Sequence, residues 1–185
     1  MRNDFYNVCE SRMTPRYREY VESRYWTFLQ TIKENLPYFN AKVAEFGCGA
    51  ANISRALHRI QIELGYVLID ADPRMLRLAQ ANMSEVTKCF ELKEADITKP
   101  IYLPEVDLIH SHGVLEHFSD EQIRTIIRNQ LALTPHLVHY VPGAKYEHPS
   151  FGDERLLTPE QWSKICKPDQ IIEFNDGFDL ILIWR

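Results

Sequence analysis

The sequence predicts an α/β fold, with a seven-stranded mixed sheet and helices on both of its faces. Two observations support this prediction. From residue 42 to residue 141, short apolar runs alternate with segments of helical periodicity, which is typical of a parallel sheet. The last two apolar runs are instead joined by the turn Asp176-Gly177, which predicts an antiparallel β-hairpin. Five parallel strands and a terminal hairpin fit one domain in a chain of 185 residues.

The expected elements follow one another in a regular order. Residues 14–36 carry apolar side chains at helical spacing, and Pro37 ends the pattern. Thr158 is the expected N-cap of a late, short helix, with Pro159 at the first helical position. Strands are predicted at residues 42–46, 66–69, 89–95, 106–110, 136–141, 171–175 and 178–184, and further helices at 50–63, 73–83 and 120–131.

The composition is that of an ordinary globular protein, and it narrows the classes of partner. Hydrophobic residues make up 45% of the chain and charged residues 25%. The net charge of −5 lacks the basic excess of proteins that bind a phosphate backbone, so we do not expect nucleic acid as a partner. The N-terminal residues lack the apolar core of a signal peptide, and no run approaches the ~20 apolar residues that span a bilayer. We therefore expect a cytoplasmic protein without membrane contact.

The four cysteines predict neither a zinc cluster nor a disulfide framework. They lie far apart, and no two of them form a CxxC pair. We expect all four to be reduced thiols. They are Cys9, Cys48, Cys89 and Cys166.

A glycine-rich turn follows the first predicted strand and leads into a helix. Residues 45–49 read Glu-Phe-Gly-Cys-Gly, and Gly47 and Gly49 would let a ligand approach the backbone. A tight turn without any ligand explains the same pattern. A dinucleotide site of the GxGxxG type would need glycine where this chain has Asn52, which disfavours a nicotinamide cofactor without excluding it.

Two carboxylates follow the second predicted strand. Asp70 stands at its end, where two ribose hydroxyl groups of a nucleotide could each donate a hydrogen bond to it. Asp72 directly precedes Pro73 and is better explained as the N-cap of the next helix. Asp70 is therefore the candidate ligand-binding carboxylate.

Polar residues also mark the end of the fourth predicted strand. Ser111, His112 and Gly113 stand where open α/β sheets bind their ligands, so we expect them to face a ligand. His110 lies within the strand and is expected to be packed. The three histidines 110, 112 and 117 span a strand end and a loop, with no preset cysteine or carboxylate partner. We therefore predict no metal site from them.

Together these segments resemble the class I S-adenosylmethionine-dependent methyltransferases of the small-molecule type. The resemblance extends from about residue 42 to the C-terminus, and it implies a Rossmann-like sheet that ends in a hairpin. It also implies S-adenosylmethionine as the cofactor. The contacts that it implies come from Glu45, Gly47, Gly49, Asp70, Asp96, Ile97, Ser111, His112 and Gly113.

The resemblance assigns a part of the cofactor to each segment. The glycine loop, with Glu45 as the acidic residue before it, lies against the amino-acid part, and Asp70 binds the ribose. Asp96, which by itself would be a turn residue, meets the adenine amino group, and Ile97 packs on the ring. Residues 111–113 face the methionine part or the sulfonium. The third glycine that is often seen in the family is Ala51 here.

The implied reaction is a direct displacement, in which a nucleophilic acceptor takes the methyl group from the sulfonium. Candidate general bases are Glu116, His117, Tyr140 and His148, although Glu116 and His117 are explained equally well as helix contacts or caps. The chain has no Asn-Pro-Pro-Tyr sequence and no Pro-Cys pair, so it does not resemble the enzymes that methylate nucleic-acid bases.

We therefore predict a methyltransferase with a small-molecule acceptor, whose identity stays open together with the oligomeric state. One alternative is a non-catalytic protein that senses the cofactor or scaffolds a partner. The other is a nicotinamide-dependent reductase.

The N-terminal segment has an aromatic character of its own. We predict a single domain over residues 1–185, in which residues 1–38 form a helical lid or cap over the cofactor. Tyr17, Tyr20, Tyr25 and Trp26 would supply its apolar contacts. Simple packing of the same helix on the sheet is the alternative.

Overall fold

The computed structural model describes residues 2–150 and 152–185 of the chain, with side chains from Phe5 onward. Within these residues, one sheet holds seven strands in the order β3-β2-β1-β4-β5-β7-β6. The first five strands pair in parallel, and β7 pairs antiparallel with both β5 and β6, so the predicted mixed sheet is confirmed. The strands are β1 (Lys42–Phe46), β2 (Gly65–Asp70), β3 (Phe90–Glu94), β4 (Leu108–His112), β5 (Leu137–Pro142), β6 (Gln170–Phe174) and β7 (Asp179–Trp184).

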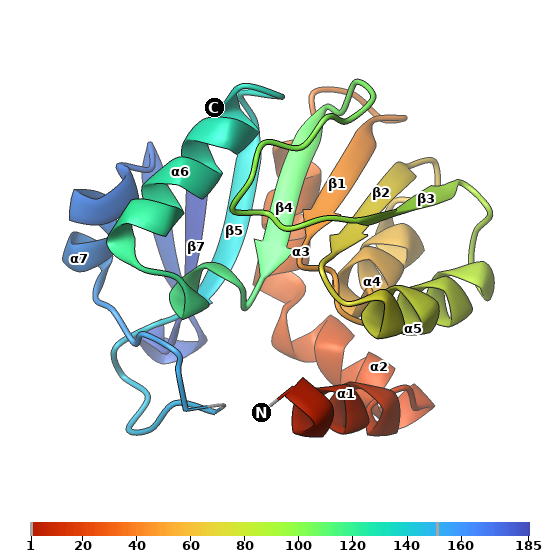
Figure 1. The fold of residues 1–185 in the computed structure, drawn as a ribbon, viewed down its shortest axis with the longest axis horizontal. Helices are drawn as coiled ribbons and strands as arrows, with labels where there is room; N and C mark the ends of the chain where they lie inside the picture. Colours follow the sequence, from red (N-terminus) through yellow and green to blue (C-terminus); the bar gives the residue numbers. More distant parts are fainter. Residues whose placement is uncertain (1, 151) are drawn as a thin grey trace.

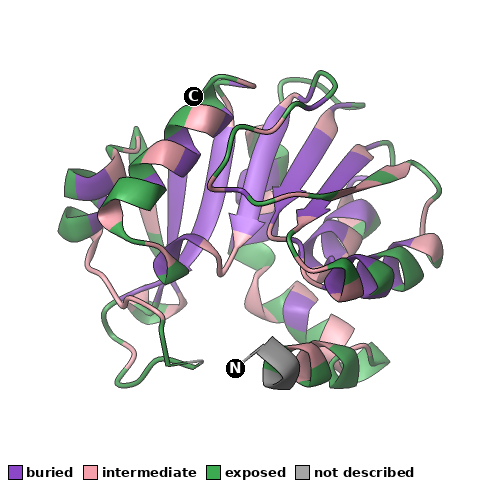
Figure 2. Ribbon diagram, in the orientation of Figure 1, coloured by how far each residue is buried: buried purple, intermediate pink, exposed green. Residues whose placement is uncertain are grey.

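Helices cover both faces of this sheet (Figure 1). One face is packed by α3 (Trp26–Glu34), α4 (Asn52–Ile60) and α5 (Pro73–Ser84), and the other by α6 (Asp120–Leu131) and α7 (Pro159–Cys166). Asp72 caps α5 and Thr158 caps α7 as predicted, each accepting a backbone N–H of its own helix. Figure 2 shows that the central strands are buried along most of their length.

The N-terminal region differs from the single helix predicted for residues 14–36. It forms α2 (Pro15–Arg24) and α3, and α1 (Arg2–Ser11) precedes them. Tyr25 separates α2 from α3, because its backbone leaves the helical region at φ −105° and ψ 21°. The Tyr25 ring packs edge-on against His112 and Tyr140 of the sheet. The helix is thus interrupted where Tyr25 packs on the sheet, and the spacing of apolar residues in the sequence does not predict this contact.

The fourth strand begins two residues later than predicted. Its pairing with β1 starts at Leu108, opposite Val43. Asp107, just before it, uses its side chain to accept the backbone N–H of Lys42 at 2.7 Å. The shift places Ser111 and His112 inside the strand rather than beyond its end. His110 is fully buried, as expected, and burial lowers its pKa to about 3, so the imidazole is neutral.

Glu45 connects strand β1 to helix α4 in the interior. Its Oε2 atom accepts the backbone N–H of Ser54 at 3.2 Å and the Ser54 hydroxyl at 2.5 Å. Ser54 lies in the first turn of α4, where N–H groups have no partner within the helix, so Glu45 caps the helix from the sheet. Burial raises the pKa of Glu45 to about 7, and the Ser54 hydrogen bonds oppose this rise.

The raised pKa of Glu45 predicts a pH-dependent stability difference between wild type and Glu45→Gln. Because the pKa rises from 4.5 to about 7 on folding, the stability that protonated Glu45 contributes is present below the unfolded value and is lost as pH rises through the folded value. The wild type should therefore lose about 3 kcal/mol relative to Glu45→Gln between roughly pH 4 and pH 8. Urea unfolding followed by circular dichroism measures this difference, with exposed Glu63→Gln as the control. A pH-independent difference for Glu45→Gln would contradict the assignment.

Candidate functional site

The loop between β1 and α4 contains three residues in the left-handed region, Gly47 (φ +69°), Gly49 (φ +51°) and Ala51 (φ +55°). The two glycines are required for different reasons. A Cβ atom on Gly47 would lie 2.7 Å from Val114 Cγ2, so packing against the loop after β4 requires glycine there. A Cβ on Gly49 would meet no described atom within 4 Å. Gly49 therefore presents an open backbone surface that a ligand can approach.

Asp70, at the end of β2, lies against this loop. Its Oδ2 atom accepts the backbone N–H of Gly49 at 2.9 Å, and its Oδ1 atom accepts that of Asp72 at the same distance. Burial raises the pKa of Asp70, and the N–H groups oppose the rise. Each carboxylate oxygen has a second lone pair, so Asp70 keeps the capacity to accept hydroxyl groups. The structure thus brings Gly49 and Asp70 together, as the sequence analysis expected of a nucleotide site.

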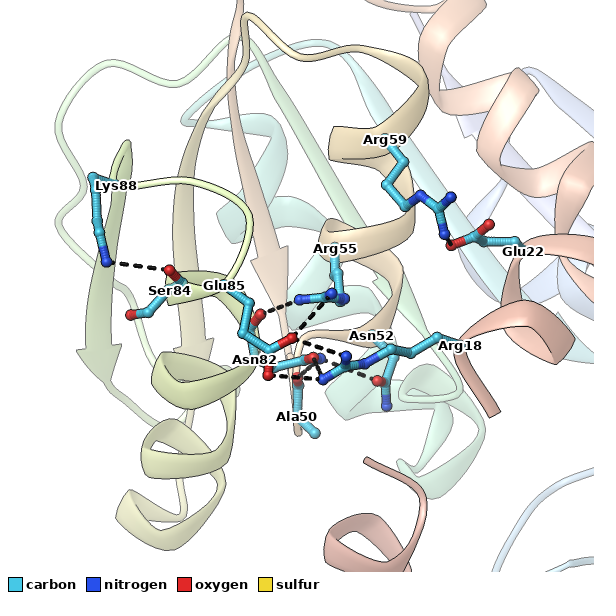
Figure 3. Close-up of polar contacts among 10 residues, drawn as sticks. All are labelled: Arg18, Glu22, Ala50, Asn52, Arg55, Arg59, Asn82, Ser84, Glu85 and Lys88. Atoms are coloured by element: carbon cyan, nitrogen blue, oxygen red, sulfur yellow. Dashed lines mark hydrogen bonds and ion pairs between the residues drawn. The ribbon is translucent and has the colours of Figure 1, made fainter. Parts of the chain in front are cut away.

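Asn82 of α5 contacts the same loop through its side-chain amide. The sequence did not predict this role. The side chain is fully buried, and its Nδ2 atom donates to the Ala50 carbonyl at 2.8 Å and to Asn52 Oδ1 at 3.1 Å (Figure 3). Arg18 of α2 donates in turn to Asn82 Oδ1 at 3.1 Å and pairs with both oxygens of Glu85. The sequence feature that could have indicated Asn82 is its place on the apolar face of an amphipathic helix. A buried amide there needs hydrogen-bond partners from outside the helix.

Asp96 and Ile97 follow β3 at the same edge of the sheet. The backbone N–H of Ala95 donates to the Asp70 carbonyl at 3.0 Å, which holds this segment beside the end of β2. The exposed side chain of Asp96 accepts the hydroxyl and the N–H of Thr98, and these bonds hold its pKa below the usual range. Ile97 is buried. Both residues lie at the predicted edge, with Asp96 also forming a local turn.

The end of β4 sends its side chains to opposite faces. The hydroxyl of Ser111 is buried on the α6 face, 2.8 Å from His139 Nδ1, so only the Ser111 backbone could contact a ligand at the edge. His112 points to the α3 face, where its ring stacks on Tyr140 with centroids 4.3 Å apart. Burial lowers the pKa of His112 to about 4. Its Nε2 atom is buried and has no partner among the described residues. Gly113 follows with φ +67°.

A buried carboxylate, Asp179, organises the region beyond His112, and nothing in the sequence around it predicted this role. Asp179 is fully buried at the start of β7. It accepts four hydrogen bonds from side chains, Arg24 at 2.7 Å, Asn175 at 2.6 Å, and the hydroxyls of Tyr140 and Tyr146 at 2.8 Å each. Burial, Tyr25 and Asp179 together raise the pKa of Tyr140 far above its usual value. This environment disfavours Tyr140 as a proton acceptor.

The remaining candidate bases lie on the other side of the β4 end. Glu116 and His117 belong to η1 (Leu115–His117), a single turn of 3-10 helix. Glu116 is 2% exposed, and burial raises its pKa to about 8. His117 is exposed, with Nδ1 at 2.9 Å from Asp153 Oδ1. His148 is exposed on the loop that follows β5.

None of the helices within the described residues has both the length and the apolar character needed to cross a bilayer.

Comparison with known proteins identifies the fold. A family model described as a methyltransferase domain matches residues 43–134, from β1 to just beyond α6. No curated protein sequence matches this chain. Among solved structures, a protein from Bordetella parapertussis described as a possible exported protein has a TM-score of 0.73 and 19% identity, over 89% of this chain and 67% of its own.

Two methyltransferases have a similar fold. A SAM-dependent methyltransferase from Aquifex aeolicus has a TM-score of 0.69 and 15% identity, over 94% of this chain and 100% of its own. Human N-acetylserotonin methyltransferase, in complex with SAM, has a TM-score of 0.66 and 14% identity, over 91% of this chain and 55% of its own. This chain thus spans little more than half of the human enzyme. The family match shows that residues 43–134 form a methyltransferase domain, and the fold of the whole chain is similar to those of S-adenosylmethionine-dependent methyltransferases of known structure.

Proposed function

We propose that this chain binds S-adenosylmethionine beside the loop of residues 47–51 and transfers its methyl group to a small-molecule acceptor. The observation that carries the proposal is the junction of Asp70 with Gly49, where a carboxylate with spare lone pairs adjoins an open backbone surface. These residues fit the cofactor, because the ribose needs hydrogen-bond acceptors and the amino-acid part needs close access to backbone. Buried Ile97 supplies an apolar surface for the adenine ring.

S-adenosylmethionine supplies an activated methyl group on its sulfonium. The chain's own residues then have to hold the acceptor in line and exclude water. We propose that the partly exposed rings of Tyr25 and His112 at the end of β4 contact the acceptor and exclude water from it, while the buried rings of Phe28 and Tyr140 pack against them. Glu116, His117 and His148 remain the proposed candidates for a base, and we assign Tyr140 to positioning because its hydroxyl donates to Asp179.

We also propose that the N-terminal helices, within residues 1–38, act as the lid of this site. Tyr6, Cys9 and Met13 of the α1 region pack against Ala50 of the glycine loop and against α5. Figure 1 shows α1 and α2 at the edge toward which the arrowheads of β1, β2 and β4 point. Arg18 fastens α2 to α5 through three hydrogen bonds. The lid therefore has both an apolar contact and a polar tether.

Cofactor binding is expected to depend on Asp70 but not on its neighbour Asp72. Asp70→Ala removes the acceptor for both the ribose and the Gly49 N–H, so the affinity for S-adenosylhomocysteine should fall by at least ~10-fold, which is about 1.4 kcal/mol. Asp72→Ala removes the cap of α5 and the ion pair with Arg74, neither of which is a proposed cofactor contact, so it should leave the affinity within about 2-fold although it costs roughly 1 kcal/mol of stability. Isothermal titration calorimetry measures both. Equal affinities in wild type and Asp70→Ala would exclude Asp70 as the ribose ligand.

Methyl transfer itself is tested with radiolabelled S-adenosylmethionine and a panel of small molecules that carry hydroxyl, amine or thiol groups. We expect label to appear in at least one of them. Binding of S-adenosylhomocysteine without transfer to any acceptor would favour the non-catalytic sensor or scaffold. Binding of a reduced nicotinamide cofactor, with no binding of S-adenosylhomocysteine, would favour the reductase.

The tether of the lid is tested by Arg18→Gln. This change removes three hydrogen bonds of a side chain that is 17% exposed, so the N-terminal helices should detach more often and be cleaved several-fold faster by thermolysin. The matched control is Arg59→Gln, which breaks the exposed pair of α4 with Glu22 of α2 (Figure 3) and should change little. Identical cleavage rates in the two variants would argue against the tether.

A further inference from the structure

A cluster of metal-ligating side chains lies outside the proposed cofactor contacts. Glu116 and His117 come from η1, and Glu154 comes from the loop that follows β5. One ligand atom of each residue lies within 4.8 Å of the ligand atoms of the other two. His117 and Glu154 are 37 positions apart in the sequence, so local residue spacing does not predict this group. It is also a different set from histidines 110, 112 and 117, because His110 and His112 are held within β4.

Glu116 has an unsatisfied acceptor inside this cluster. The residue is 2% exposed, and its Oε2 atom is buried without a hydrogen-bond partner among the described residues. A buried carboxylate is costly unless a cation or several donors compensate it. The carboxylates of Asp153 and Glu154 face it and add negative charge. The nearby cation Arg155 directs its guanidinium to Asp120 and to the Phe118 carbonyl instead.

His117 has a carboxylate partner on one ring nitrogen, as metal-binding histidines commonly do. Its Nδ1 atom lies 2.9 Å from Asp153 Oδ1. In the tautomer that donates Nδ1–H to this carboxylate, the other ring nitrogen keeps its lone pair for a metal ion. A carboxylate that fixes the tautomer in this manner is the usual outer partner of a histidine ligand.

We propose that Glu116, His117 and Glu154 bind one divalent cation, with Asp153 orienting His117. Two carboxylates balance the charge of a dication, and one imidazole among oxygen ligands suits Mn²⁺, Fe²⁺ or Zn²⁺ better than Ca²⁺. The remaining coordination positions are open to water or to an anionic oxygen. Glu116 Oε1 lies 3.4 Å from where a Cβ of Gly113 would stand, so the cation would adjoin the end of β4. In this assignment Glu116 and His117 are metal ligands rather than general bases, so His148 is the candidate base that remains. Binding of the cation does not depend on the proposed methyl transfer.

The test is a titration of chelator-treated protein with Mn²⁺, in which electron paramagnetic resonance measures the free ion. We expect one Mn²⁺ per chain, displaced by Zn²⁺. Glu154→Gln and His117→Gln change side chains that are not fully buried, and each should weaken binding at least ~10-fold. Glu116→Gln should do the same. The matched control is Glu147→Gln, an exposed carboxylate of the same loop, which should bind Mn²⁺ like the wild type.

Circular dichroism checks that each variant folds. If Glu116→Gln does not fold, the proposal is tested with Glu154→Gln and His117→Gln alone. Failure of the wild type to bind Mn²⁺, or equal binding by wild type, Glu154→Gln and His117→Gln, would overturn the proposal. Because the titration contains no S-adenosylhomocysteine, its failure is distinguishable from a failure of the proposed function.

Discussion

The carboxylate of Asp70 is the contact on which the proposed cofactor site depends, because it joins the loops that follow β1 and β2. Parallel pairing sets Phe46 opposite Ile69, so the two strands end at the same level and Asp70 meets the Gly49 N–H. Without this acceptor, the Gly49 amide, which lies in the left-handed region, would lose its hydrogen-bond partner in the protein. The loop shape is therefore fixed by the protein, and binding would cost little further ordering.

Most of the fold could be predicted from the sequence, because each buried strand is a short apolar run and four helices, α2, α5, α6 and α7, begin at a capping side chain. The terminal hairpin and the caps Asp72 and Thr158 are confirmed for this reason. The break at Tyr25 and the start of β4 at Leu108 could not be predicted, because they depend on contacts with distant strands. Local propensity sets the type of an element more firmly than its ends.

The positions of Gly49 and Asp70 in the candidate site could be predicted, because each residue follows the end of a predicted strand. The contacts of Ser111 and His112 were harder to predict, because they depend on the direction in which each side chain points. Successive side chains of a strand point to opposite faces, so Ser111 turns to His139 while His112 turns to Tyr140. Asn82 and Asp179 were missed because each is one polar residue in an apolar pattern, and its partners lie far away in the sequence.

Four carboxylates near the carboxyl edge of the sheet show how this protein compensates buried negative charge. Asp70 accepts backbone N–H groups, Glu45 accepts the Ser54 N–H and hydroxyl, and Asp179 accepts an arginine, an amide and two hydroxyls. Glu116 differs from these three, since its Oε2 atom has no donor among the described residues and two further carboxylates face it. The chain supplies donors of its own to the other three, and at Glu116 the proposed cation would take the place of those donors.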